Sequence, residues 1–167
     1  MNLGEKILEV VFGANEEEVI MRTKKTAVES FVSGRLKEAR ESFNSAYKKS
    51  DIDTDTERDS KELMEITTIM IEAEEDRKKE KYSEYIYKMQ KIYSECKNDD
   101  MKAFIGENRN KQAQKFEEIA ENLKDEGKLE DAKKFFQFAY KICTPENPKK
   151  KELQDKLNGN DKNWELL

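Results

Sequence analysis

Apolar residues recur along this chain at spacings of three and four, the period of an α-helix with one buried face. The segment from Gly34 to Asp51 carries Leu36, Ala39, Phe43 and Ala46 at successive spacings of three, four and three. The two alanines would let a neighbouring helix approach closely, and the phenylalanine would fill the space between them. The pattern predicts a packed amphipathic helix.

The same pattern returns near the C-terminal end, where Gly127 to Thr144 aligns with Gly34 to Asp51 without a gap. The equivalent apolar positions are Leu129, Ala132, Phe136 and Ala139. A glycine precedes each helix and follows another apolar-periodic segment, so we expect it to take a positive φ and to end the earlier helix. Each copy is therefore predicted to be a helix, a tight turn and a second helix.

A degenerate third copy is predicted between these two, with its turn at Glu80. Ala73 precedes this turn, and the apolar positions that follow it are Tyr82, Tyr85, Met89 and Ile92. The three turns, at positions 34, 80 and 127, then lie 46 and 47 residues apart. Such even spacing indicates a repeated unit.

Over residues 115–145, and in part over 34–50, the sequence resembles the tetratricopeptide repeat family. That family's pattern runs aromatic, Leu, small, bulky, turn Gly, Ala, aromatic, Ala and Pro. The residues that fall on it here are Phe116, Ile119, Ala120, Leu123, Gly127, Ala132, Phe136, Ala139 and Pro145. The family's usual period is about 34 residues, so we expect the additional residues both in longer leading helices and in loops.

The resemblance, together with the 46- and 47-residue spacing of the turns, implies one all-α domain over residues 1–167, with antiparallel helical hairpins stacked on one another at a period of about 46. The three hairpins are expected at about 16–50, 56–97 and 100–144. A short helix is expected near 3–12. Pro145 and Pro148 mark a helix stop and a new start, so a capping helix from about 148 to 158 should close the stack, with the rest of 148–167 as a tail.

The charge pattern and the residue types exclude several functions. The 32 basic and 37 acidic side chains give a net charge of −5 and are interspersed, whereas a general nucleic-acid binder carries a basic face. The absence of histidine removes the usual catalytic triads and His-metal sites. Cys96 and Cys143 form no CxxC pair. We therefore expect a non-enzymatic protein without a cofactor.

No membrane span and no secretory signal are expected. The opening MNLGEKILEVVFG lacks a basic start and a small-residue cleavage site, and no stretch approaches the roughly 18 apolar residues of a membrane helix. A cytoplasmic location with reduced thiols follows as an expectation.

The resemblance also implies a partner-binding groove on the leading helices of the hairpins, with another protein or a peptide as its ligand. Carried over by register, the groove residues are Met21, Lys24, Val28 and Phe31, then Met70 and Arg77, then Gln114, Glu117, Glu121 and Lys124. This groove runs from apolar to acidic, which an amphipathic helix with a basic end would complement. The family's clamp for a C-terminal carboxylate is not reproduced, because only Lys24 fits it.

Three alternatives remain open. The N-terminal helix, with Ile7, Leu8, Val11 and Phe12, could instead cover Val28, Phe31 and Val32. The same helix, or the tail with Trp164, Leu166 and Leu167, could join copies of the chain into a homo-oligomeric structural bundle.

The third alternative is a calcium-responsive protein. The stretch DIDTDTERDSKE places Asp51, Asp53, Asp55, Asp59 and Glu62 at the ligand positions of an EF-hand loop. Thr56, however, stands where that loop needs a glycine. The competing interpretation of the same stretch is an acidic connection whose Asp and Thr residues cap the next helix.

Overall fold

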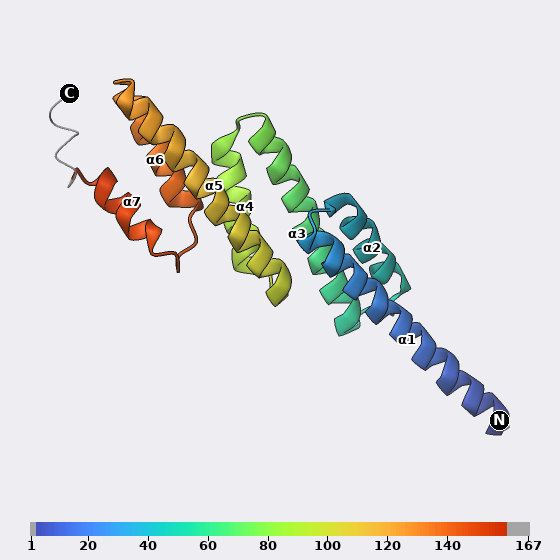
Figure 1. Ribbon diagram of the computed structural model, residues 1–167. Coiled ribbons are helices and arrows are strands. Elements are labelled where there is room, and N and C mark those ends of the chain that lie inside the picture. Colours follow the sequence, from blue (N-terminus) through green and yellow to red (C-terminus); the bar gives the residue numbers. More distant parts are fainter. Residues whose placement is uncertain (1–2, 160–167) are drawn as a thin grey trace. The chain divides into compact units, whose positions relative to one another are not determined.

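The computed structural model describes the backbone of residues 3–159 and the side chains of residues 16–159 (Figure 1). This part of the chain forms helices and no strand, which confirms the all-α class. The helices are α1 (Leu3–Val32), α2 (Leu36–Lys49), α3 (Asp55–Lys78), α4 (Tyr82–Glu95), α5 (Asp99–Asp125), α6 (Leu129–Ile142) and α7 (Lys149–Leu157).

The three predicted turns share one backbone structure. The φ angle is 77° at Gly34, 58° at Glu80 and 77° at Gly127. At each turn this residue donates its N–H to the carbonyl three positions earlier, and the next residue donates to the carbonyl five positions earlier, over 2.9 to 3.1 Å. This is the Schellman arrangement that closes a helix with a residue in the left-handed region. The predicted turn positions are confirmed, including the one occupied by glutamate.

The same positions around each turn are buried. They lie seven residues before the turn and five, nine and twelve residues after it, and none of their side chains is more than 1% exposed. The sets are Ala27, Ala39, Phe43 and Ala46; Ala73, Tyr85, Met89 and Ile92; Ala120, Ala132, Phe136 and Ala139. The repeat read from the sequence is therefore also a repeat of local packing, even though only the first and third copies share residue types.

The long period arises in the leading helices. The helices that follow the turns, α2, α4 and α6, have 14 residues each, whereas α1, α3 and α5 have 30, 24 and 27. Only residues 50–54 and 96–98 connect one such helix pair to the next. The sequence expectation placed the additional residues in loops as well, and the structure corrects this, because the polar leading segments continue as helix.

The chain divides into two compact units. The first contains the residues up to Glu72 together with Cys96–Met101. Here α2 packs along α1, whose N-terminal end extends beyond it (Figure 1). The short helix predicted near 3–12 is not separate, because α1 is continuous from Leu3 to Val32. A single glycine at position 13, with no proline near it, costs about 1 kcal/mol and does not end a helix. The side chains of Ile7, Leu8, Val11 and Phe12 lie outside the described residues.

The second unit contains Ala73–Glu95 and the chain from Lys102 onward. Within it α4 packs against α6, and α6 packs against α7. Four rings from α4, α5 and α6 form an aromatic cluster, with centroid distances of 5.0 to 5.9 Å: Tyr82, Phe116, Phe135 and Phe138. Leu153 of α7 is fully buried. The predicted helix after Pro148 is thus present, and it covers part of this unit.

Candidate functional site

The predicted groove residues of α1 fall into two groups. Met21 is 65% exposed, and Lys24 forms an ion pair with Asp59 of α3. Val28 is half-buried. Phe31, in contrast, is fully buried and belongs to the core of the first unit. A partner could reach the first two side chains but not Phe31.

The predicted groove residues of α3 differ in their surroundings. Met70 is only 2% exposed and lies in the core of the first unit. Arg77 belongs to the second unit, where it donates two hydrogen bonds to Glu74 Oε2, at 3.0 Å through Nε and 2.8 Å through Nη2. The Arg77 guanidinium is therefore held by its own helix.

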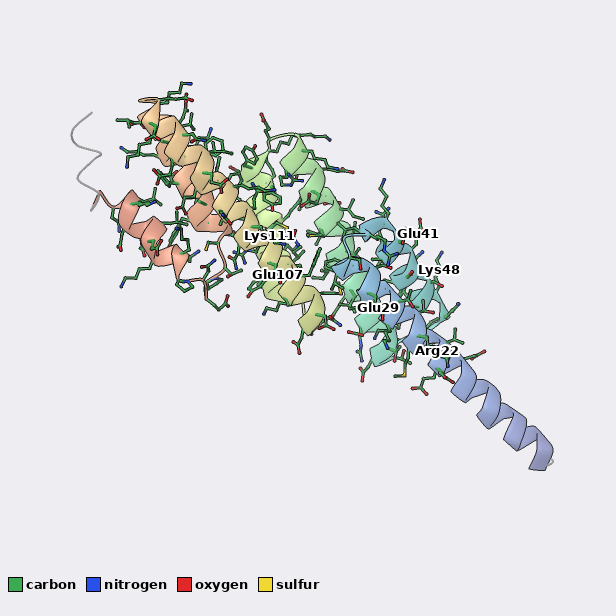
Figure 2. All side chains as sticks on the ribbon, viewed as in Figure 1. Arg22, Glu29, Glu41, Lys48, Glu107 and Lys111 are labelled. Carbon is green, nitrogen blue, oxygen red and sulfur yellow. The ribbon has the colours of Figure 1, made fainter. Side chains whose placement is uncertain are left out.

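The structure brings together the predicted residues of α5. Gln114, Glu117 and Glu121 line one open groove of about 970 Å³ in the second unit. Its remaining lining is largely polar and includes Glu107, Asn110, Lys111, Glu118, Asn122, Asn147 and Lys149. Glu107 and Lys111 extend from α5 near its middle (Figure 2). Lys124, also predicted, does not line this groove.

Two lysines of α7 face the glutamates of this groove. Lys149 Nζ lies 3.1 Å from Glu117 Oε1, and Lys156 Nζ lies 3.5 Å from the same oxygen. Lys156 Nζ also lies 2.7 Å from Glu121 Oε1. The Glu117 side chain is 15% exposed, and its other oxygen, Oε2, is buried without a hydrogen-bond partner. The face formed by Glu117 and Glu121, called here the acidic face of α5, therefore already contacts a basic helix.

The α7 helix starts from a capped helix end that the sequence did not reveal. Arg109 of α5 donates from Nε to the carbonyl oxygen of Ile142 over 2.8 Å and from Nη2 to that of Cys143 over 3.1 Å. Lys150 Nζ donates to the carbonyl oxygens of Tyr140 and Cys143 over 2.9 and 3.3 Å. Cations at the carboxyl end of a helix complement its dipole and its unpaired carbonyls.

Burial lowers the pKa of both these cations, since desolvation disfavours the charged form. Asn110, next to Arg109, accepts the N–H of Thr144 over 3.0 Å. No local pattern marks Arg109 or Asn110, because their partners lie more than 30 positions away in the chain.

The stretch from Asp51 to Glu62 caps a helix and does not form an EF-hand loop. Thr54 Oγ1 accepts the N–H of Glu57 over 3.2 Å, and Glu57 Oε2 accepts the N–H of Asp53 over 2.6 Å. These two bonds cap the start of α3 at Asp55, so Asp55, Asp59 and Glu62 are helical.

The carboxylates of this stretch have separate partners. Asp55 pairs with Arg58, Asp59 with Lys24, and Glu62 with Lys97 at 3.8 Å. Among the described residues no group of three or more acidic, Cys or His side chains could hold a metal ion. The structure places three of the five predicted calcium ligands on a helix, and the capping interpretation is confirmed for Thr54 but not for the aspartates.

Within residues 3–159, no helix is both long enough and apolar enough to cross a membrane. Trp164, Leu166 and Leu167, the tail residues considered for self-association, lie outside the described residues. Comparison with known proteins found no matching family model, no matching curated protein and no matching solved structure.

Proposed function

We propose that this chain is a cytoplasmic, non-enzymatic protein-binding module of the tetratricopeptide-repeat type, which binds an amphipathic helix with a basic end along its leading helices. Support for the repeat comes from the shared turn and from the burial of the same four positions around each turn. A scaffold role also suits a chain without histidine. The trailing helices use their apolar faces for packing, so the leading helices are the elements left to meet a partner.

The observation that carries this proposal is the open groove on α5. Gln114, Glu117 and Glu121, selected by register from the sequence, line it together. Four glutamates and two lysines contribute to its wall. A groove of about 970 Å³ with an acidic excess favours a ligand that presents positive charge. The partner class we propose is therefore a helix whose basic end meets Glu117 and Glu121.

The proposal is tested with synthetic peptides and the full chain. A helix-forming peptide with one apolar face and a Lys-rich end is compared, by isothermal titration calorimetry, with the same peptide carrying Glu at that end. We expect binding of the basic peptide only, weakening as salt is raised. In the Glu121→Lys variant, affinity should fall about tenfold, since a favourable charge contact becomes repulsive.

Glu95→Lys is the matched control, because Glu95 is exposed and does not line the groove. It makes the same charge change and should leave the affinity unaltered. Equal affinity for the basic and acidic peptides, or an equal loss in the control, would contradict the proposal.

Self-association through α1 is a second candidate. The 14 residues of α2 can accompany only about half of the 30-residue α1, so the N-terminal half extends beyond its hairpin (Figure 1). That half carries Ile7, Leu8, Val11 and Phe12 in its sequence. Light scattering over a dilution series distinguishes the two. A mass that rises with concentration in the wild type, and not in Leu8→Glu, would favour association.

A further inference from the structure

We propose that α7 is an internal occupant of the acidic face of α5, and that the partner is a helix with a matching face, a basic residue, Leu and Lys at positions i, i+4 and i+7, which binds by displacing α7. This inference rests on the proposed function and names the partner's recognition chemistry. It also makes α7 a competitor of the partner.

The face of α7 that contacts α5 defines the spacing of basic and apolar residues that we expect in the partner helix. Lys149, Leu153 and Lys156 lie at positions i, i+4 and i+7, which places them on one side of the helix. Both lysines contact Glu117, and Lys156 also contacts Glu121. Leu153, between them, is fully buried. Lys156 Nζ also lies 5.4 Å from the centroid of the Phe136 ring, close enough for a cation–π contact. An amphipathic basic helix is thus already bound where register predicted such a ligand.

The way α7 is held allows displacement. It has nine residues, too few for a stable helix in water without tertiary contacts. Leu153 is its one fully buried side chain among the described residues. Its start is anchored by Lys150 on the end of α6, whereas its far end is held by Lys156 on Glu117, which is 15% exposed, and on Glu121, which is 40% exposed. Release of the Lys156 end would free Glu121, and full release of Glu117 requires that Lys149 also leave its carboxylate.

Glu117 provides a reason for a partner to bind better than α7. Its Oε1 receives both lysines, and its Oε2 is buried without a hydrogen-bond partner. A lysine ammonium is a point charge, whereas a guanidinium presents two parallel donors to both oxygens of a carboxylate. We therefore infer that the partner carries arginine at the position that corresponds to Lys149. The additional charge-assisted bond should tighten binding about tenfold relative to lysine.

The test uses the full chain and a synthetic helical peptide with the K-x-x-x-L-x-x-K face. A release variant combines Lys149→Glu with Lys156→Glu, which places like charges opposite Glu117 and Glu121. The control is Lys151→Glu, since Lys151 is an exposed lysine of the same helix. If α7 occupies the site most of the time, the release variant should bind the peptide about tenfold or more tightly than the wild type. The control should bind like the wild type.

A second measurement needs no variant. Hydrogen–deuterium exchange of the amides of residues 149–157 in the wild-type chain should speed up when the peptide is added, because displaced α7 loses its helix. A peptide with Arg at the first basic position should bind about tenfold more tightly than the Lys peptide. Equal affinities of the two peptides would overturn the inference that an arginine of the partner donates a hydrogen bond to Glu117 Oε2.

The failures of the two proposals are distinguishable. If the peptide binds wild type and release variant with equal affinity and α7 stays protected from exchange, α7 is a permanent cap and the displacement proposal is wrong. The proposed function would then stand for the open groove on α5, with the peptide bound while α7 stays in place. If no basic peptide binds either protein, both proposals fail for α5.

Discussion

Arg109 of α5 donates its Nε hydrogen to the carbonyl oxygen of Ile142 over 2.8 Å, so a side chain of one helix closes the carboxyl end of another. The Arg109 side chain is almost fully buried and forms no ion pair with a carboxylate among the described residues. Its positive charge is balanced by the carbonyls at the end of α6 and by the Tyr93 ring, whose centroid lies 4.9 Å away. The contact joins α5, α6 and the connection to α7.

Substitution of Arg109 should therefore destabilise the second unit. Arg109→Met keeps most of the buried volume and leaves the carbonyls of Lys141, Ile142 and Cys143 without this donor, so we expect a loss of about 2–4 kcal/mol in the free energy of unfolding. Lys111→Met, at an exposed site of the same helix, should change it by less than about 0.5 kcal/mol. Urea denaturation followed by circular dichroism measures both. A similar stability for the two variants would contradict the capping role.

The turn at Glu80 predicts a stabilising substitution. Glu80 has a φ of 58°, in the region where a side chain is unfavourable, while the equivalent residues are Gly34 and Gly127. Glu80→Gly should therefore raise the free energy of unfolding by about 0.5–1 kcal/mol, after allowance for the greater freedom of glycine in the unfolded chain.

The control for this substitution is Glu75→Gly, at an exposed position within α3. It should lower the stability by about 1 kcal/mol, because glycine is a poor helix former. Chemical denaturation of both variants gives the comparison. Destabilisation by Glu80→Gly would show that the glutamate makes a compensating contact.

Gly106 and Tyr93 should be energetically coupled. A Cβ at Gly106 would lie 3.1 Å from Cε2 of Tyr93, whose ring also meets Lys102 and Arg109 at 4.9 Å each. With Tyr93 present, we expect Gly106→Ala to leave the free energy of unfolding almost unchanged or to lower it. In a Tyr93→Ala background it should stabilise by about 1 kcal/mol, the helix propensity of alanine over glycine. A double-mutant cycle measures the coupling, and additivity within about 0.5 kcal/mol would exclude it.

Tyr85 should make the chain sensitive to alkali. It is 1% exposed, and burial raises its pKa well above the usual value, with the nearby Glu74 adding to the effect. In the unfolded chain this tyrosine ionises near pH 10, whereas in the folded chain it keeps its proton. The contribution of Tyr85 to the free energy of unfolding is therefore complete below about pH 10 and declines above it. The decline approaches about 1.4 kcal/mol per pH unit.

Tyr85→Phe provides the control for this pH dependence, because it keeps the ring and removes the ionisable group. The free energy of unfolding, measured by denaturation at a series of alkaline pH values, should fall more steeply for the wild type than for the variant. Parallel curves would show that Tyr85 ionises without unfolding.

The turns and trailing helices could be predicted from sequence because their signals are local. Gly34 and Gly127 mark positive φ, and the apolar spacing after each marks the buried face. Glu80 carries no such signal itself, and its turn followed only from the even spacing between copies. The cap at Thr54 was also readable, since Glu57 stands three positions later.

The proposed binding face was only partly predictable. Register placed Phe31 and Met70 on it, but both are buried. The leading helices have 24 to 30 residues and lengthen the repeat beyond the family's period of about 34, so a register taken from shorter helices need not identify the exposed side. The contacts of Arg109 and of α7 join residues more than 30 positions apart, and charges spread over 41% of the chain give no indication of which pairs meet.

The shared turn has a consequence for chirality. At Gly34 and Gly127 the backbone takes the conformation that a D-amino acid prefers, and both sites are exposed. A chain made by chemical ligation with D-alanine at position 127 should be more stable than one with glycine, since D-alanine restricts the unfolded chain without strain in the folded one. L-alanine at the same position should be less stable. The mirror-image pair would therefore separate the effect of backbone handedness from that of side-chain size.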